Sequence, residues 1–289
     1  SCPDYDVVVI GGGIVGMSTA ALLADLDLNV ALIAPDNQVR TPVGEIHARC
    51  YAITPASQVV LEAVGAWQEI DHSRIGRFDG MEVWDSGSNG YLHFNTPATH
   101  VGPMGWIIEH QNLAAALTTA LETRTSIAVH RQKMTDISQG IQPRVWLQDG
   151  TEVVARLAVG ADGVNSAVRN VGGVELVREP YEQNAIVCNV VCELPHNGIA
   201  RQCFLDSGPI AFLPLMEPNC CSIVWTCAPD IARAISVSKE QDFCRQLEEA
   251  FGNKLGTVTA AGPRLSFELE RIKVAQSVFG NCVLVGDAA

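Results

Sequence analysis

The chain has 289 residues, of which 47% are hydrophobic and 18% are charged, against a usual charged fraction of about 25%. This length and composition fit one large domain or two, and they exclude a disordered chain. Thirty-two acidic residues against 19 basic ones give a net charge of −13, which argues against nucleic-acid binding and against membrane adhesion through charge. Contact with a membrane through apolar surface stays open.

The first elements predict a βαβ unit. Tyr5–Ile10 is a short, apolar, β-branched run typical of a buried parallel strand, and Ile14–Leu26 has the apolar spacing of a helix. Asn29–Ala34 predicts a second buried strand. Three glycines interrupt the first apolar stretch and no basic leader precedes it, so we expect neither a signal peptide nor a membrane span there.

Alternating strands and helices are predicted along the rest of the chain. In chain order they are a helix from Thr54 to about Trp67, a hairpin over 80–94, a helix near 109–123, strands near 127–130, 135–138, 145–148 and 153–159, a strand-rich stretch over 184–228, a helix over 238–251 and a buried strand over 282–285. Ten cysteines without a CxxC pair are expected to be free thiols in a reducing compartment. Seven histidines show no metal-ligand spacing, so we expect no metal site and only surface or core roles for them.

A glycine-rich turn between the first strand and helix matches a dinucleotide fingerprint. Gly11 permits the tight turn, Gly13 lets backbone N–H groups approach a pyrophosphate, and Gly16 lets the helix pack closely on the strand. The alternative is a glycine turn without a ligand. The first acid after the second strand is Asp36, which is either the ribose-binding carboxylate of the fingerprint or a solvated loop acid.

Two further loops carry a carboxylate at the end of an apolar run. Asp162 and Gly163 follow one strand, and Asp162 can order amides around a pyrophosphate or accept a hydrogen bond from a ribose. Arg169, one short helix later, can pair with Asp162 or with a phosphate. Gly286 and Asp287 follow the last strand and place a carboxylate near a ribose or ribityl hydroxyl. Taken alone, each of these two loops is also compatible with an ordinary turn.

These three motifs, in this order, resemble those of the class A flavin monooxygenases, aromatic hydroxylases that bind FAD on a Rossmann-type domain. Residues 49–57 (RCYAITPAS), followed by Leu61, Gly65 and Trp67, resemble a signature of the ubiquinone-biosynthesis hydroxylases. Three shorter segments are also similar to that group, nearest to its octaprenylphenol hydroxylase branch: 80–85, 211–215 and 222–225.

The resemblance implies an α/β fold with two domains. A Rossmann-type FAD-binding domain like that of para-hydroxybenzoate hydroxylase would comprise 1–77, 101–172 and 271–289. A second, mostly antiparallel β domain for the substrate would comprise 78–100 and 173–270. After Gly286-Asp287-Ala288-Ala289 the family continues with a segment that covers the flavin, so we expect this chain to be truncated at its C-terminus.

The resemblance also implies roles for individual residues. Arg49 would reach the flavin side of the cofactor, with a surface arginine as the alternative, and Glu109 would contact the cofactor, with a helix N-terminal acid as the alternative. The implied cofactor-binding set is Gly11, Gly13, Gly16, Asp36, Arg49, Glu109, Asp162, Gly163, Arg169, Gly286 and Asp287. No residue is implied as catalytic base.

The implied reaction is hydroxylation of a polyprenylated phenol ring on the way to ubiquinone, with FAD, NAD(P)H and O2. A prenylated substrate implies peripheral contact with a membrane through apolar surface, and the free thiols predict a cytoplasmic protein, which places that contact at the inner membrane. A ubiquinone-biosynthesis complex and a homo-oligomer are the candidate assemblies. Two alternatives remain at this stage. One is an NAD-dependent dehydrogenase, and the other is a truncated module without flavin that has a structural or assembly role.

Overall fold

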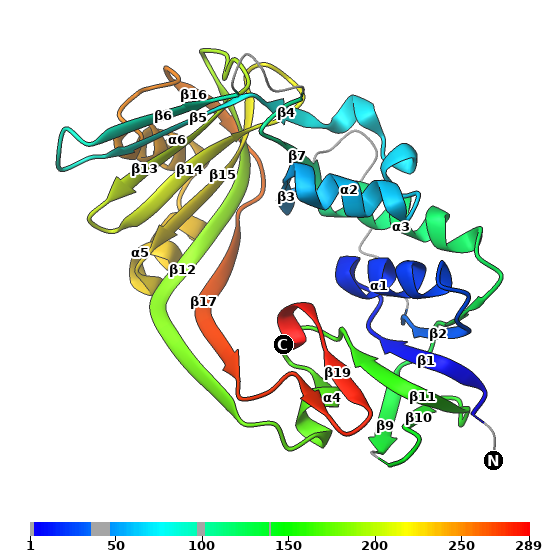
Figure 1. Cartoon of the computed structure of the whole chain (residues 1–289). Coiled ribbons are helices and arrows are strands. Elements are labelled where there is room, and N and C mark those ends of the chain that lie inside the picture. The colour runs from blue at the N-terminus through cyan, green and yellow to red at the C-terminus, as the bar shows by residue number, and fades with distance from the viewer. Residues whose placement is uncertain (1–2, 36–46, 97–101, 139) are drawn as a thin grey trace.

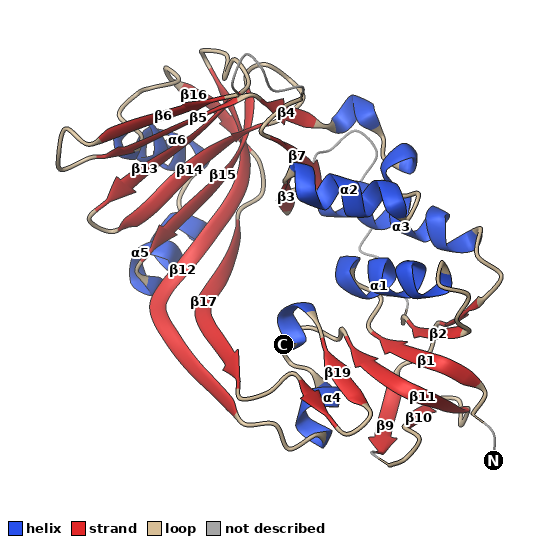
Figure 2. Cartoon of the chain, viewed as in Figure 1, coloured by secondary structure: helices blue, strands red, loops and turns tan. Residues whose placement is uncertain are grey.

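The computed structural model describes residues 3–35, 47–96, 102–138 and 140–289. Its described strands form two eight-stranded sheets and one three-stranded sheet (Figures 1 and 2). The first strand, β1 (Tyr5–Ile10), and the last, β19 (Cys282–Leu284), belong to the same eight-stranded sheet, which we call the parallel sheet. The other eight-stranded sheet is called the second sheet.

The parallel sheet is buried on both faces. Its other strands are β2 (Val30–Ile33), β8 (Ile127–His130), β9 (Met134–Ser138), β10 (Arg144–Leu147), β11 (Glu152–Gly160) and β18 (Val278–Phe279). Val7 and Val9 of β1 belong to the core that contains α1 (Ile14–Ala24) and α3 (His110–Glu122), whereas Val8 and Ile10 belong to a second core on the opposite face. Burial on both faces explains why these strands read as continuous apolar runs.

The strand order of the parallel sheet reverses beside β1. The central order is β19-β11-β1-β2-β8, with parallel pairing throughout. The chain therefore leaves β1 toward β2 and β8 on one side, and returns to β11 and β19 on the other. In open parallel sheets, ligands bind outside the carboxyl ends of the strands at such a switch point.

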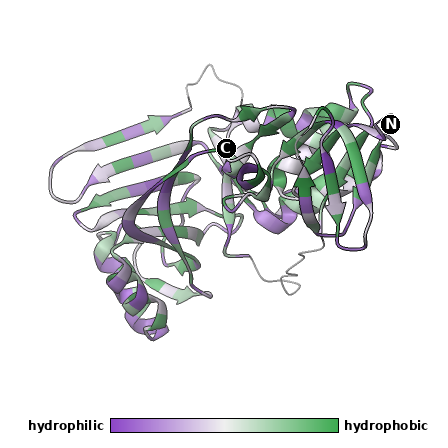
Figure 3. Ribbon diagram, turned by 90° about the horizontal axis from the view of Figure 1, so that it is seen from below, coloured by the Kyte–Doolittle hydropathy of each residue, from purple (hydrophilic) through white to green (hydrophobic). Residues whose placement is uncertain are grey.

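The second sheet has one face covered by helices. Its strands are β5 (Gly80–Asp85), β6 (Tyr91–Asn95), β12 (Leu176–Cys192), β13 (Ile199–Leu205), β14 (Gly208–Pro214), β15 (Cys220–Cys227), β16 (Val258–Ala261) and β17 (Leu265–Val274). The helices α5 (Pro229–Val237) and α6 (Glu240–Ala250) cover a core that includes Ile186, Phe212 and Phe243. Along its strands green and paler or purple residues alternate in Figure 3, as expected for a sheet with two unlike faces.

A three-stranded sheet joins these two parts. It consists of β3 (Cys50–Ile53), β4 (Gly76–Phe78) and β7 (Gly105–Glu109), and β7 leads directly into α3. Side chains from this sheet, among them Phe78 and Ile107, pack in one apolar cluster with Ala200 and Leu215 from the second sheet and the turn after β14. A further link is the pair β12–β17, whose strands run side by side toward the parallel sheet (Figure 1).

The structure shortens one predicted helix and contains several elements that were not predicted. The helix predicted from Thr54 to about Trp67 is α2 (Pro55–Ala63), because Gly65 at φ +72° follows its end. Helix α5 and the strands β3, β4, β7, β16, β17 and β18 were not predicted, and β12 begins at Leu176 instead of near 184. The alternating apolar residues of β17 are a strand pattern that the prediction overlooked, whereas the first half of β12, which pairs with β17, is mostly polar and solvent-exposed. The predicted domain limits stay a prediction.

None of the helices within the described residues is long and apolar enough to cross a membrane.

We expect Gly16→Ala to destabilise the fold. A Cβ on Gly16 would overlap the carbonyl oxygen of Gly11, so α1 would have to move away from β1. Overpacking of this kind costs about 1–3 kcal/mol of unfolding free energy, measurable by urea denaturation. Gly13→Ala is the matched control, because a Cβ there meets nothing within 4 Å. Equal stability of the two variants would contradict the close approach.

Candidate cofactor-binding site

Three predicted loops lie side by side at the carboxyl edge of the parallel sheet. In the strand register Ile10 pairs with Gly160, and Gly160 pairs with Leu284. The backbone continues this alignment past the strand ends: the Ala161 N–H donates to the Ile10 carbonyl at 2.7 Å, and the Val285 N–H donates to the Gly160 carbonyl at 3.0 Å. The structure thus brings the three motifs together at the switch point between β1 and β11.

The glycine-rich loop leaves the start of α1 open. Gly11 has φ +123°, and a Cβ on it would collide with the backbone of Ala161 in the neighbouring loop. Gly13 is the N-cap of α1, without a side-chain cap and without an acidic residue in the first helical turn. The first amides of α1 are therefore available to an anion, and a Cβ on Gly13 would project into unfilled space where a ligand could approach.

Asp162 organises the second loop. Its Oδ2 accepts hydrogen bonds from the backbone N–H groups of Ala167 (2.7 Å) and Val168 (3.3 Å), at the start of α4 (Ala167–Val171). Its Oδ1 is buried without a hydrogen-bond partner in the described part of the chain. One oxygen of this carboxylate therefore shapes the loop, and the other is an unused acceptor. Gly163 beside it has φ +82° and nothing near its Cβ position.

Arg169 ties the second loop to the third. The side chain is 1% exposed, and its guanidinium donates to the carbonyls of Val164 (2.6 Å) and Ala288 (3.2 Å). The expected partners of Arg169 were Asp162 or a phosphate, but the observed partners are backbone carbonyls on two loops. Burial explains this outcome. A guanidinium buried between two loops lies within reach of their backbone carbonyl groups, which accept its hydrogen bonds. A direct contact between Arg169 and a cofactor stays a prediction.

Arg49 and Asp287 come to the site from distant parts of the sequence. Arg49 immediately precedes β3, and its guanidinium lies 5.5 Å from the centroid of the Tyr51 ring. Burial raises the pKa of Tyr51, the charge of Arg49 and a hydrogen bond with Arg49 oppose that rise, and the charge of Asp287 adds to it. Gly286, at φ +61°, turns the chain after β19 into the short turn that carries Asp287.

Glu109 holds the segment before Arg49 in place. The Glu109 carboxylate is 3% exposed and receives two hydrogen bonds from the Arg74 guanidinium, at 2.8 and 2.9 Å. It also accepts the backbone N–H of His47 at 2.6 Å. The structure therefore gives the carboxylate an internal role, and contact between Glu109 and a cofactor stays a prediction.

The same segment touches the second sheet. The Asn189 side-chain amide on β12 donates to the His47 carbonyl at 3.2 Å. Next to it, burial raises the pKa of the Cys50 thiol to about 12, and a hydrogen bond with Ser222 on β15 opposes that rise. A thiol that stays protonated near neutral pH is a poor nucleophile, so Cys50 is a packing residue here.

The chain fits FAD at the three loops. The open space at Gly13, the free amides of α1, the unused acceptor of Asp162 and the exposed cation of Arg49 are the features that a dinucleotide with a pyrophosphate needs. Asp36, predicted to bind the ribose, lies outside the described residues. Sequence reasoning missed Arg74 and Asn189, for which the sequence carries no motif. It also missed Tyr51 and His110, whose side chains are hydrogen-bonded to each other.

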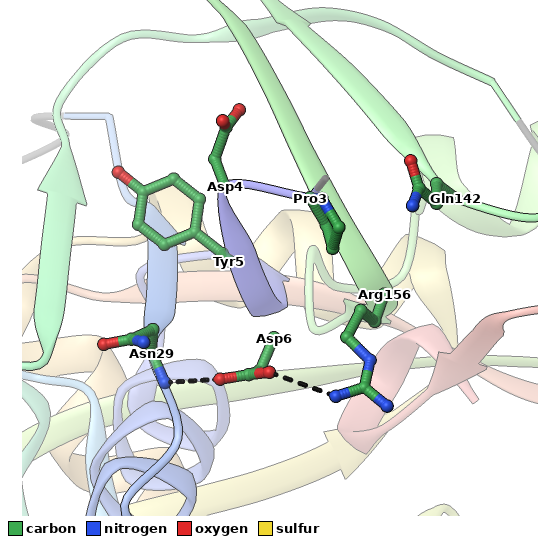
Figure 4. A pocket seen from close by; sticks show the side chains of 7 residues that line it. All are labelled: Pro3, Asp4, Tyr5, Asp6, Asn29, Gln142 and Arg156. Atoms are coloured by element: carbon green, nitrogen blue, oxygen red, sulfur yellow. Dashed lines mark hydrogen bonds and ion pairs between the residues drawn. The ribbon is translucent and has the colours of Figure 1, made fainter. Parts of the chain in front are cut away.

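A different hollow lies at the opposite end of β1. It has a volume of about 400 Å³ and is lined by residues from the first strand and its surroundings, as Figure 4 shows: Pro3, Asp4, Tyr5, Asp6, Asn29, Gln142 and Arg156. The Asp6 carboxylate is occupied there by the Asn29 N–H at 3.0 Å and by Arg156 at 3.4 Å. This hollow is at the amino edge of the sheet, away from the three loops.

We expect Glu109→Gln to lower the free energy of unfolding. Removing the charge weakens the two hydrogen bonds that the Arg74 guanidinium donates, and since the Arg74 side chain is 32% exposed, we expect a loss of about 1.5–3 kcal/mol of unfolding free energy. Glu152→Gln is the control: its pair with Arg144 is about 40% exposed on both sides, and exposed pairs contribute about 0–1 kcal/mol. Urea denaturation of both variants checks this, and a loss below about 1 kcal/mol for Glu109→Gln would refute the buried role.

Comparison with known proteins gives the family. A family model described as FAD binding domain matches residues 4–289. The chain is 35% identical over 286 residues to the ubiquinone hydroxylase UbiL of Rhodospirillum rubrum, covering 98% of this chain and 66% of that protein. It is 32% identical over 292 residues to the human mitochondrial ubiquinone biosynthesis monooxygenase COQ6, covering 93% of this chain and 61% of that protein. The chain thus spans about two thirds or less of the length of these two relatives.

A third relative is the 3-demethoxyubiquinol 3-hydroxylase of Escherichia coli K12, 30% identical over 298 residues, with 98% of this chain and 73% of that protein covered. Among solved structures, Pseudomonas aeruginosa PqsL in complex with 2-aminobenzoylacetate has a TM-score of 0.80 at 20% identity, over 98% of this chain and 78% of that chain. The p-nitrophenol 4-monooxygenase PnpA of Pseudomonas putida has a TM-score of 0.73 at 18% identity, over 98% of this chain and 72% of that chain. These two likenesses show a shared fold. The chain therefore belongs to the FAD-binding family of class A flavin monooxygenases, in the group of the ubiquinone-biosynthesis hydroxylases.

Proposed function

We propose that this chain belongs to an enzyme that hydroxylates the aromatic ring of a polyprenylated phenol in ubiquinone biosynthesis, using FAD, NAD(P)H and O2. The observation that carries the proposal is the alignment of three cofactor-type loops at one switch point, through the pairs Ile10–Gly160 and Gly160–Leu284. The names of the relatives supply the substrate class. The particular branch of the group stays a prediction.

The residues of the chain would hold FAD in separate ways. The amides at the start of α1, opened by Gly13, would take the pyrophosphate, and Arg49 would place a positive charge beside the anionic cofactor. Asp287 and the free oxygen of Asp162 would accept hydroxyl hydrogen bonds. Bound FAD would supply the redox chemistry, with NAD(P)H as reductant and O2 as oxygen source. The protein would contribute orientation and exclusion of water.

The exposed face of the second sheet supports an apolar substrate. One lateral row crosses seven strands, and none of its residues is buried although all but Gln202 are apolar: Leu92, Val83, Gln202, Ala211, Val224, Val187 and Leu265. Residues opposite one another in a sheet share a face, and so do residues two apart along a strand. The row therefore lies on the same face as Asn189 and Ser222, which adjoin the Arg49 segment.

A large apolar area left uncovered on a sheet face is typical of a binding surface. Helices α5 and α6 cover the opposite face of this sheet, so its two faces are unequally protected. We assign the uncovered face to the prenylated substrate. Because such a substrate resides in a lipid bilayer, we also propose that the protein works in the cytoplasm, in peripheral contact with the inner membrane through apolar side chains.

The first experiment is a titration of FAD into this chain, followed by quenching of flavin fluorescence. We expect a dissociation constant in the micromolar range or tighter, because the described loops would supply the anion site without further residues. Gly13→Val should weaken FAD binding at least tenfold, because its side chain would occupy the space through which the pyrophosphate approaches the amides of α1.

Gly87→Val, in the exposed turn between β5 and β6, is the matched control and should bind FAD as the unaltered chain does. Unchanged affinity in a folded Gly13→Val variant would refute the pyrophosphate site. With FAD bound, a prenylated phenol and NAD(P)H should yield a product heavier by one oxygen atom, detected by mass spectrometry. Absence of FAD binding would favour the alternative of a module without flavin, and FAD binding without that product would contradict the proposed reaction for this chain.

A further inference from the structure

Tyr51 and His110 form a hydrogen-bonded pair at the edge of the candidate site. Tyr51 lies on β3, and His110 is the first residue of α3. The Tyr51 hydroxyl lies 3.1 Å from His110 Nδ1, and their ring centroids are 5.7 Å apart. The backbone reinforces this contact, because the His110 N–H donates to the Arg49 carbonyl at 2.9 Å and extends the β3–β7 pairing by one step. The hydrogen-bond ladder between β3 and β7 therefore fixes the backbone positions of Arg49, Tyr51 and His110 relative to one another.

The ionisation states of the pair define the direction of its hydrogen bond. Burial raises the pKa of Tyr51, so the phenol stays protonated near neutral pH. Burial lowers the pKa of His110, and the charges of Arg49 and His47 lower it further. The start of α3 also disfavours a cation at this position. The Tyr51 hydroxyl therefore donates to Nδ1 of a neutral imidazole, whose own proton is on Nε2.

The anchored Tyr51 ring offers its face to Arg49. The guanidinium stands 5.5 Å from the ring centroid, within the range of a cation–π contact. Arg49 itself is exposed, and an exposed arginine side chain samples many rotamers unless a contact restricts it. The charged groups that face this pair are Arg49 and His47 before β3, and Asp287 from the loop after β19.

We propose that Tyr51 and His110 are positioning residues that hold the Arg49 guanidinium in place to receive the anionic cofactor. The His110 acceptor fixes the Tyr51 ring through its hydroxyl, and the ring face then restricts Arg49. The inference rests on the proposed function, because it takes FAD as the ligand of this site. It gives roles to two side chains that carry no cofactor motif in the sequence.

A double-mutant cycle with FAD tests the proposal. Tyr51→Leu removes the ring face and should weaken FAD binding about two- to fivefold, the range of an exposed cation–π contact. In an Arg49→Gln background the same substitution should have no further effect, because Tyr51 acts only through Arg49. Tyr5→Leu is the matched control: Tyr5 also packs against a histidine, His130, at a centroid distance of 6.2 Å, but away from the three loops.

A second readout needs no cofactor. Tyr51→Phe removes the hydrogen bond that favours neutral His110, and Arg49→Gln removes a repelling charge, so each should raise the His110 pKa measured by NMR titration. Tyr5→Phe should leave that pKa unchanged. Where Tyr51→Leu does not fold, His110→Ala takes its place in the cycle and should likewise weaken FAD binding only when Arg49 is present.

The outcomes separate this inference from the proposed function. Absence of FAD binding by the unaltered chain would overturn both. FAD binding that weakens with Arg49→Gln but not with Tyr51→Leu would overturn the inference alone, and so would an undiminished effect of Tyr51→Leu in the Arg49→Gln background. A His110 pKa that does not move in Tyr51→Phe would overturn the anchoring step. Non-additive FAD affinities together with a raised His110 pKa would support the proposal.

Discussion

The candidate site depends on the lateral pairing of three strand ends, Ile10, Gly160 and Leu284. Parallel pairing forces the chain to leave all three strands at the same edge, so loops separated by more than a hundred residues become neighbours. The reversal of strand order beside β1 then leaves the space above this edge free of a crossover connection. The cofactor-type motifs can therefore act together only because the sheet register aligns them, and Arg169 secures that alignment by bonding to carbonyls of two of the loops.

An ion pair with a buried carboxylate holds the segment before Arg49 in place, as the sheet register aligns the glycine loop. The Glu109 carboxylate binds Arg74 through two hydrogen bonds and the His47 N–H through a third, so it holds a segment that has no regular structure of its own. A buried carboxylate with these partners is costly to separate, since each partner would lose a charge-assisted hydrogen bond. The position of Arg49 therefore depends on Glu109, the last residue of β7.

The sequence predicted the parallel sheet well, because strands buried on both faces carry unbroken apolar runs and the glycine spacing marks the first turn. The sequence-based prediction failed for strands that are held by pairing with another strand and not by burial of their side chains. The first half of β12 pairs with β17 largely outside the core, and its mostly polar residues do not indicate a strand. The same limit applies to the site. Arg74 and Asn189 acquire their roles from contacts over 35 and 142 residues, and a histidine such as His110 carries no signal until its partner is known.

The short segment from His47 to Arg49 is hydrogen-bonded to two of the three sheets. Its backbone N–H at His47 bonds to Glu109 of the three-stranded sheet, and the carbonyl of the same residue accepts from Asn189 of the second sheet. Arg49 lies two residues later and shares the surroundings of Tyr51 with the Asp287 loop of the parallel sheet. A shift of the second sheet would therefore displace the peptide that precedes Arg49, the cation that we propose faces the cofactor. Since the uncovered apolar face belongs to that sheet, the surface assigned to the substrate and the residue assigned to the cofactor are joined by one hydrogen bond and two peptide units.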